Sequence, residues 1–249
     1  MNTQTVLEVR GLTKNYEDAR AVEGVGFSVQ AGEVVGLLGP NGAGKTTTIS
    51  MILGVLEPTA GSVLIDGINV QSDRQEALGR TNFSAVYAQL PWNLTVYENL
   101  YIFCLLYGVQ NARERVRELL REFELGKFAD INCGRLSSGE QTRVHLAKAM
   151  SNKPRILLLD EPTASLDPSA ARIIREKVRA WTATGAGGVL WTSHNMHEVE
   201  TVCDRVLFLS RGKILLEGDP KTLPRTYGKE NLEELFITIA REPLSLELE

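Results

Sequence analysis

The most constraining feature of this sequence is a glycine-rich stretch, Gly39-Pro-Asn-Gly-Ala-Gly-Lys-Thr46, directly after the short apolar run Val34–Leu38. A nearly continuous apolar run of this length is typical of a strand buried on both faces of a parallel sheet. Residues 46–53 follow with helical spacing and end at Gly54. Strand, glycine-rich turn and helix together predict a parallel α/β sheet with a phosphate site at the end of this strand.

The stretch matches G-x-x-x-x-G-K-[ST], the P-loop pattern, and its chemistry explains the residue types. The glycines let backbone N–H groups wrap phosphate oxygens without side-chain interference, and the helix that follows adds its positive dipole end. Lys45 brings a positive charge to the β- and γ-phosphates, and the Thr46 hydroxyl can ligate Mg²⁺. The predicted nucleotide contacts are Gly39, Pro40, Asn41, Gly42, Ala43, Gly44, Lys45, Thr46 and Thr47.

A second apolar run, Ile156-Leu-Leu-Leu159, ends in the two carboxylates Asp160 and Glu161. Ligand sites of α/β proteins lie at the carboxyl ends of such strands. Asp160 is therefore placed to hold Mg²⁺, and Glu161 to orient or deprotonate an attacking water. The guanine-binding pattern Asn-Lys-x-Asp is missing, because Asn152-Lys153 is followed by Pro154-Arg155. The sequence thus favours ATP over GTP.

The rest of the chain alternates strands and helices around an all-helical middle. Strands are expected near residues 6–9, 26–30, 62–65, 188–192, 206–210 and 213–216. Helices are expected over residues 95–106, 112–124, 137–150, 168–182, 196–203 and 231–240. The pattern predicts an α/β core that is interrupted by a helical insertion near residues 90–150.

Composition limits the function classes. Lys and Arg number 27 against 31 Asp and Glu, so the net charge is −4, and nothing suggests the basic footprint of a nucleic-acid binder. No apolar run approaches the 18 or so residues of a membrane span. The cysteines Cys104, Cys133 and Cys203 lie far apart, as expected of reduced thiols in a cytosolic protein.

With these motifs in this order, nearly the whole chain resembles the nucleotide-binding subunit of an ATP-binding cassette (ABC) transporter. Leu136-Ser-Ser-Gly-Glu140 resembles the family signature Leu-Ser-Gly-Gly-Gln and departs from it at Ser138 and Glu140. Gln89 resembles the Gln-loop residue, Ser165-Leu-Asp167 the D-loop, and His194 the switch histidine. Tyr16 resembles the aromatic residue that stacks on adenine.

The resemblance implies an α/β fold in which a P-loop NTPase core carries an antiparallel β subdomain and an inserted α-helical subdomain. It implies one ABC ATPase domain over 1–249, with the core at 1–88 and 151–220, the helical subdomain at 89–150 and a C-terminal extension at 221–249. ATP and Mg²⁺ are the implied cofactors, and Thr46, Gln89 and Asp160 the implied metal contacts.

The resemblance also implies roles for residues outside the P-loop. Gln89 and His194 would sense or contact the γ-phosphate, with His194 also bonded to Glu161, and Tyr16 and Val22 would border the adenine. Signature and D-loop residues would contact ATP held by the opposite subunit of a head-to-tail homodimer. These are Ser137, Ser138, Gly139, Glu140 and Asp167.

The expected function is therefore the hydrolysis of ATP to drive a separate membrane permease, with the subunit attached to the inner face of the membrane through that permease. The tail from Asn231 and the stretch from Gln89 to Thr95 resemble bacterial exporter subunits for drugs, antibiotics or polysaccharides. One alternative is a soluble ABC ATPase that acts on a ribosome or another assembly. A further alternative is a small-molecule P-loop kinase.

Overall fold

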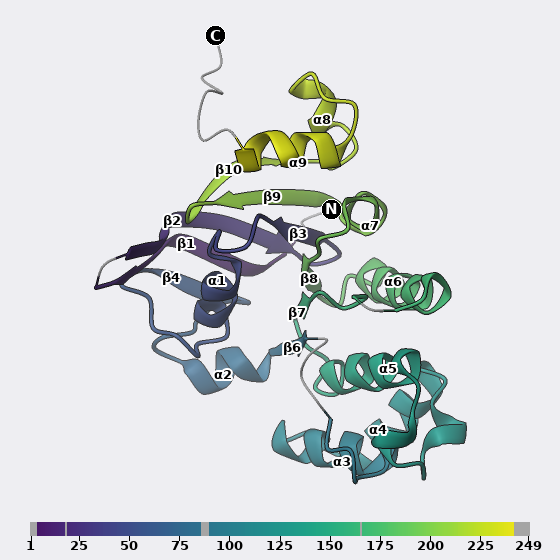
Figure 1. The fold of residues 1–249 in the computed structure, drawn as a ribbon. Coiled ribbons are helices and arrows are strands. Elements are labelled where there is room, and N and C mark those ends of the chain that lie inside the picture. Colours follow the sequence, from purple (N-terminus) through teal and green to yellow (C-terminus); the bar gives the residue numbers. More distant parts are fainter. Residues whose placement is uncertain (1–3, 18, 86–89, 165, 242–249) are drawn as a thin grey trace.

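The computed structural model describes residues 4–17, 19–85, 90–164 and 166–241, and a six-stranded sheet lies at its centre (Figure 1). Its strands are β3 (Val34–Leu38), β6 (Thr81–Ala85), β7 (Ile156–Asp160), β8 (Gly188–Thr192), β9 (Arg205–Ser210) and β10 (Lys213–Gly218). The order is β10-β9-β3-β8-β7-β6, and all neighbours are parallel except β10 with β9. This confirms the predicted parallel core.

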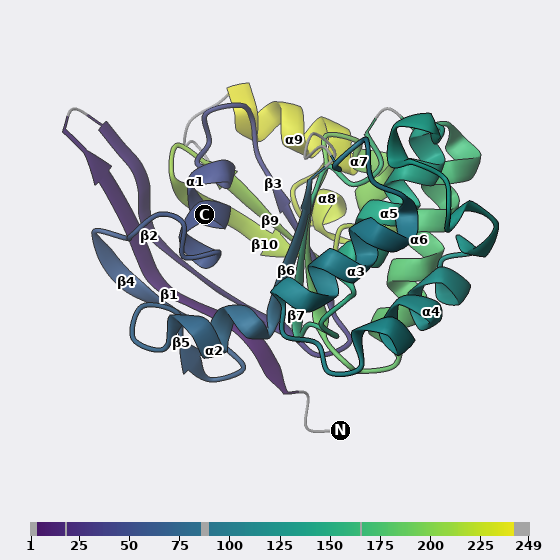
Figure 2. The ribbon, with the colours of Figure 1, turned by 90° about the horizontal axis from the view of Figure 1, so that it is seen from below.

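A second sheet is antiparallel and packs beside the first. It contains β1 (Thr5–Tyr16), β2 (Ala19–Gln30), β4 (Ala60–Ile65) and β5 (Ile68–Asn69), in the order β2-β1-β4-β5. Figure 2 shows β1 and β2 as a long pair that extends past the rest of the molecule. The sheets meet closely at Gly188, where an added Cβ would lie 2.5 Å from the carbonyl oxygen of Gln30, so only glycine fits there.

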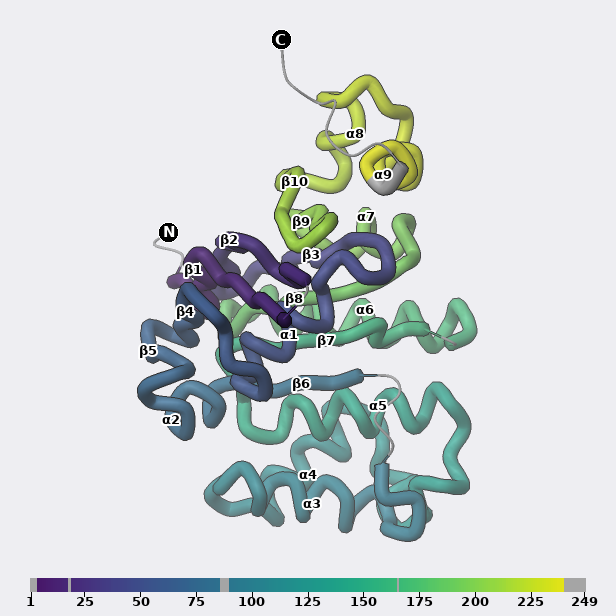
Figure 3. The backbone as a smooth tube through the Cα atoms, turned by 60° about the vertical axis from the view of Figure 1, so that its left-hand side comes forward, coloured from purple at the N-terminus to yellow at the C-terminus, as the bar shows by residue number. Residues whose placement is uncertain are grey.

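Helices surround the parallel sheet and continue away from its β6 edge (Figures 1 and 3). They are α1 (Lys45–Ile52), α2 (Arg74–Gly79), α3 (Val96–Leu106), α4 (Ala112–Glu122), α5 (Ser138–Ala149), α6 (Pro168–Ala183), α7 (Met196–Val202), α8 (Leu223–Thr226) and α9 (Leu232–Arg241). Two 3₁₀ turns, Gly126–Phe128 and Cys133–Arg135, lie between α4 and α5. Among the described residues, no helix is both long enough and apolar enough to cross a bilayer.

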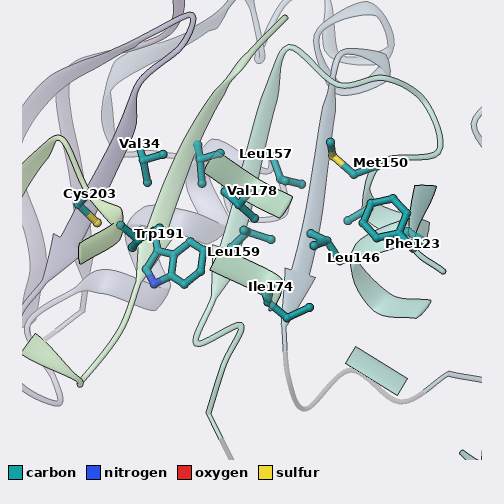
Figure 4. Close-up of a cluster of buried hydrophobic side chains, with 14 of the residues drawn as sticks. Val34, Phe123, Leu146, Met150, Leu157, Leu159, Ile174, Val178, Trp191 and Cys203 are labelled. Carbon is teal, nitrogen blue, oxygen red and sulfur yellow. The ribbon is translucent and has the colours of Figure 1, made fainter. Parts of the chain in front are cut away.

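The side chains of the parallel strands alternate between two hydrophobic clusters. Val34, Leu157 and Trp191 belong to the cluster that also contains residues of α5, α6 and α7, part of which is shown in Figure 4. Val35 and Leu158 belong to the other cluster, which contains residues of α1 and of the antiparallel sheet. Every residue of β3 and β8 is buried, because both faces of the sheet are covered.

Sequence patterns located most elements, and most of their ends agree with the structure to within a few residues. The exceptions are β1 and β2, which were expected near residues 6–9 and 26–30 but are each 12 residues long. The structure adds β5, α2, β6 and α8, which were not predicted. Strand β6 was missed because Asn82 and Ser84 make it polar, although both are buried. The Asn82 amide donates to the Asn152 side chain at 2.9 Å and so offsets the cost of burial. The division at residues 89–150 and 221–249 stays a prediction.

Candidate nucleotide-binding site

The P-loop joins β3 to α1 and follows a path that only glycine permits at two positions. A Cβ on Gly39 would lie 2.1 Å from the carbonyl oxygen of Leu209 in β9. Gly44 has φ of +106°, and its Cβ would lie 2.6 Å from the carbonyl oxygen of Ala21. The Gly212 backbone N–H also donates to the Ala43 carbonyl at 3.0 Å. The loop is thus held against β2 and the β9–β10 turn with little freedom to move.

A hollow of about 300 Å³ opens above this loop, and we call it the P-loop hollow. Helix α1 begins at its floor, and its N-cap Gly44 provides no side chain for the free N–H groups. Free N–H groups at a helix start attract anions. The hollow is lined by Ala21, Pro40, Asn41, Gly42, Ala43, Gly44, Lys45, Thr46, Thr47, Asp160, Glu161 and His194.

Lys45 is half-buried and points back over the loop. Its Nζ donates to the carbonyl oxygens of Gly39 at 2.5 Å and Pro40 at 3.2 Å. Burial lowers the pKa of Lys45, while the nearby carboxylates Glu161 and Asp160 oppose that shift. The ammonium group is therefore held at the mouth of the loop by weak acceptors that a phosphate can replace.

Asp160 and Glu161, at the end of β7, are both held by Thr192. Thr192, the parallel neighbour of Asp160 in β8, donates its hydroxyl to Asp160 Oδ1 at 2.5 Å. Glu161 has φ of +53°, which is uncommon for a residue other than glycine. Its backbone N–H donates to the carbonyl and hydroxyl oxygens of Thr192 at 3.2 and 3.1 Å. One threonine therefore fixes both carboxylate residues.

Glu161 and His194 meet across the P-loop hollow. The Nε2 atom of His194 lies 3.1 Å from Glu161 Oε1, and the two side chains are 56% and 20% exposed. Burial raises the pKa of Glu161, with His194 opposing the shift and Asp160 adding to it. A carboxylate with a raised pKa and a fixed hydrogen-bond partner is suited to accept a proton from water.

The signature residues and Asp167 form a second hollow, of about 290 Å³, which we call the signature hollow. Ser137 and Glu140 form a reciprocal capping box at the start of α5. Glu140 Oε2 accepts from the Ser137 N–H at 2.8 Å, and the Ser137 hydroxyl accepts from the Glu140 N–H at 3.4 Å. The Asp167 side chain caps α6 by accepting from the N–H groups of Ser169 and Ala170. Ser138 and Gly139 complete the predicted set in this hollow.

The structure places the remaining predicted residues as follows. Tyr16 is half-exposed at the end of β1, with the Lys14 ammonium 5.5 Å from its ring centroid, and it does not line the P-loop hollow. Val22 is buried below the P-loop, where its Cγ2 would lie 3.3 Å from a Cβ on Gly44. Gln89 and Ser165 lie outside the described residues. The thiols of Cys104, Cys133 and Cys203 are free and buried.

Thr192 is a site residue that the sequence did not reveal. A threonine inside an apolar strand is an ordinary β-former, so its type carries no signal. Only the register of β7 against β8, which pairs Asp160 with Thr192, identifies it. In the sequence, Thr192 could be noticed only as part of the predicted apolar strand before His194.

A strand–loop–helix phosphate site after β3, with two carboxylates at the end of β7, the next strand but one in the same sheet, defines a P-loop NTPase. Comparisons with known proteins narrow this class. The sequence profile of the family described as "ABC transporter" matches residues 22–164. The protein named "Nod factor export ATP-binding protein I" from Burkholderia orbicola is 41% identical over 219 residues, which cover 87% of this chain and 72% of that protein. Its namesake from Rhizobium sp. is 36% identical over 98% of this chain and 81% of that protein.

Solved structures agree with this assignment. An ATP-binding subunit of an ABC transporter superposes with a TM-score of 0.83 at 31% identity, covering 94% of this chain and 99% of that one. A dimeric ATP-binding cassette in a post-hydrolysis state, bound to ADP and Pi, gives a TM-score of 0.73 at 28% identity, covering 86% and 98%. The chain belongs to the ABC transporter family, and it is the ATP-binding and ATP-hydrolysing subunit of such a transporter. The predicted family and fold are confirmed.

Proposed function

We propose that two copies of this chain close around two ATP molecules, with each P-loop hollow completed by the signature hollow of the other copy. One observation carries the proposal: among the residues that the structure describes, the two hollows of a single chain have no lining residue in common. Lys45 and Ser137 thus belong to separate sites, although the resemblance assigns both to one nucleotide. Exchange between two copies in a head-to-tail arrangement brings both groups to each ATP. The dimeric cassette among the solved structures supports a dimer of this chain.

The residues at the P-loop hollow fit a magnesium nucleotide. Mg²⁺ prefers oxygen ligands and is commonly held by one or two carboxylates together with substrate phosphates. Asp160 lines the hollow with its Oδ1 held by Thr192, and Thr46 lines it with a hydroxyl group. Asp160 and Thr46 would hold the ion, with Gln89 as a third proposed contact. The bound ion would neutralise charge that develops on the phosphates.

Glu161 is the proposed general base, and His194 is its proposed partner. The His194–Glu161 contact at 3.1 Å orients the carboxylate toward the hollow that both residues line. Glu161 would take a proton from the attacking water, and His194 would bond to the γ-phosphate that this water attacks. Lys45 would exchange its bonds to the Gly39 and Pro40 carbonyls for phosphate oxygens. Tyr16 and Val22 remain proposed contacts of the adenine.

Glu161→Gln tests the base and the dimer together. The amide keeps the size of the side chain and can still accept from His194, but it loses most of its basicity. Hydrolysis should fall by about 10² to 10⁴, while ATP binding survives because the P-loop is unchanged. The variant should elute as a dimer with ATP and Mg²⁺, and as a monomer with ADP. Adding Lys45→Ala should abolish that dimer.

Two results would refute parts of this proposal. Wild-type hydrolysis by Glu161→Gln would exclude Glu161 as the base. An inactive variant that stayed monomeric at saturating ATP would contradict the head-to-tail site. With γ-phosphate-labelled ATP, the label should appear as free inorganic phosphate and not on added small-molecule acceptors. This result would distinguish ATP hydrolysis from kinase activity.

We further propose that the exposed apolar surface of α3 and the preceding loop docks a cytoplasmic helix of a membrane permease. Trp92 is 74% exposed, although Val96 close by is fully buried. Three apolar residues on α3, Ile102, Leu105 and Leu106, are also exposed. Ile102, Leu105 and Leu106 are three and four residues apart, so they share one face of α3, and exposed apolar patches mark interaction sites in soluble proteins. Helix α3 is therefore divided: Val96, Leu100 and Cys104 pack inside, and Ile102, Leu105 and Leu106 face outward.

The export direction and the attachment to the inner face of the cell membrane are part of the same proposal. The export direction is supported by the relatives, which are named as export ATP-binding proteins. In membranes that contain the permease, Leu105→Glu should uncouple ATP hydrolysis from export and leave the ATPase activity of the free subunit intact. Val55→Glu is a matched control, because Val55 is equally apolar and 76% exposed, but belongs to another segment. Normal export by Leu105→Glu would refute the docking surface.

A further inference from the structure

Glu198 is a carboxylate in the interior beside the P-loop hollow, and it is absent from the set of lining residues. It lies in α7, and its side chain is only 3% exposed. A buried charge is costly unless it is paired and hydrogen-bonded. The partners of Glu198 therefore explain why this residue is tolerated there.

Three side chains from three different segments converge on this carboxylate. The Thr163 hydroxyl, from the segment that follows β7, donates to Glu198 Oε1. The guanidinium of Arg175, in the middle of α6, approaches the same oxygen at 3.2 Å. The Ser193 hydroxyl, at the end of β8, donates to the other oxygen, Oε2, at 2.7 Å. Both carboxylate oxygens are thus in use.

The two hydroxyl donors adjoin the two proposed catalytic groups. Thr163 is two residues after Glu161, and Ser193 directly precedes His194. Glu161 and His194 are the pair that meets at 3.1 Å. Glu198 therefore links the two backbone segments whose side chains must stay in contact.

The segment that carries His194 is held by a closed set of bonds. The Ser193 hydroxyl accepts from the Asn195 N–H at 3.1 Å while it donates to Glu198. The Asn195 side chain in turn accepts from the Glu198 N–H at 3.2 Å and caps α7. Moving the Glu198 carboxylate would disturb Ser193 and with it the backbone that positions His194.

We propose that Glu198 is a positioning residue for hydrolysis, which holds Glu161 and His194 at their working distance through Thr163 and Ser193. The inference rests on the proposed roles of Glu161 and His194. A misplacement of about 1 Å at a reacting group can reduce the rate about 10²-fold. Arg175 adds a link to α6, the helix that begins beside Asp167 in the signature hollow.

A second ion pair on the same helix provides a control. Arg179, one turn after Arg175, contacts Asp204 at 2.7 Å. Asp204 also accepts from the Val34 N–H at the start of β3, at 2.8 Å. This pair ties α6 to the core just as Arg175 and Glu198 do, but neither member bonds to the segments around Glu161 and His194.

The test compares Glu198→Gln with Asp204→Asn. Thr163 and Ser193 donate to different oxygens of Glu198. In Glu198→Gln one of these oxygens becomes an NH₂ group, which donates and cannot accept, so one of the two bonds is lost. Glu198→Gln should lower kcat by about 10- to 100-fold and leave the Kd for ATP unchanged. Asp204→Asn should keep the wild-type kcat, whatever its effect on Tm. In the Glu161→Gln background, Glu198→Gln should produce no further loss, because the positioned base is already gone.

Three results would overturn the inference: wild-type kcat in folded Glu198→Gln, an equal loss in Asp204→Asn, or a full additional loss in the Glu161→Gln background. If Glu198→Gln does not fold, Thr163→Val and Ser193→Ala decide, because each removes one hydroxyl and keeps the Glu198–Arg175 pair. Each should lower kcat without changing the Kd for ATP, and wild-type kcat in both would refute the role. Full activity of Glu161→Gln alone would instead refute the proposed base.

Discussion

Glu140 provides the sharpest test of how the signature hollow works, because it places a negative charge where a triphosphate is proposed to bind. Its carboxylate accepts from the Ser137 N–H at 2.8 Å, and this bond holds the pKa of Glu140 below its usual range. The group is therefore charged at neutral pH. Glu140→Gln removes that charge and keeps an oxygen that can accept the same bond.

The expected effect on the stability of the monomer is small. A carboxylate in the first turn of an exposed helix stabilises it by about 0.3–1 kcal/mol through the helix dipole. For a chain of this length, such a loss lowers Tm by at most about 4 °C. Because the folded pKa of Glu140 is lowered, its contribution is present above the unfolded value and disappears as pH falls through the folded value. The difference between wild type and Glu140→Gln should therefore begin to narrow as pH falls below the ordinary glutamate value of about 4.3, and vanish below the lowered folded value.

The expected effect on the dimer is larger and opposite in sign. Two unit charges about 8 Å apart repel by about 2 kcal/mol at an effective dielectric constant of about 20. Removing this repulsion strengthens association by up to about 30-fold at each site. The assay is sedimentation with ATP and Mg²⁺ in the Glu161→Gln background, with and without Glu140→Gln. The gain should shrink in 1 M salt, where the screening length falls to about 3 Å.

Glu140→Ala separates the charge from the capping box. It removes the same charge but also removes the acceptor for the Ser137 N–H, so it should cost about 1 kcal/mol more in stability than the amide. If Glu140→Gln weakened the dimer, or if its gain were unchanged in 1 M salt, the Glu140 carboxylate would not face the phosphates of the partner's ATP.

Three further predictions follow from buried or half-buried titratable groups. Lys45→Ala should weaken ATP binding strongly in equilibrium titrations, with an unchanged circular dichroism spectrum. Burial raises the folded pKa of Glu161, so the protein loses stability as pH rises through this folded pKa and the carboxylate becomes charged. Without nucleotide, Glu161→Gln should therefore have a higher Tm than the wild type at pH 8, and the two Tm values should converge at pH 4. Burial lowers the pKa of His145 from 6.5 to about 4. As pH falls from about 6.5 to about 4, the wild type should therefore lose up to about 3 kcal/mol of unfolding free energy through this group, and His145→Leu should lack that loss.

The sequence was sufficient to predict the centre of the fold because its strongest patterns lie there. Val34–Leu38 and the P-loop form a strand, a turn and the start of a helix within a few residues, and each of these three has its own recognisable sequence pattern. The helix expected over residues 137–150 is likewise a local signal, and the structure adds to it the capping box between Ser137 and Glu140. Local patterns therefore predicted the parts of the site that a continuous segment builds.

Contacts between distant segments could not be predicted in this way. Glu198 lies in Met196-His-Glu-Val-Glu200, where a glutamate resembles any solvated residue of an amphipathic helix. Its burial depends on Thr163 and Arg175, which lie 35 and 23 residues away in the chain. Since the buried carboxylate depends on partners from other segments, the cluster is a property of the packed helices α6 and α7 against the ends of β7 and β8. The same packing brings His194 to Glu161, so the burial of Glu198 and the geometry of the catalytic pair have one cause.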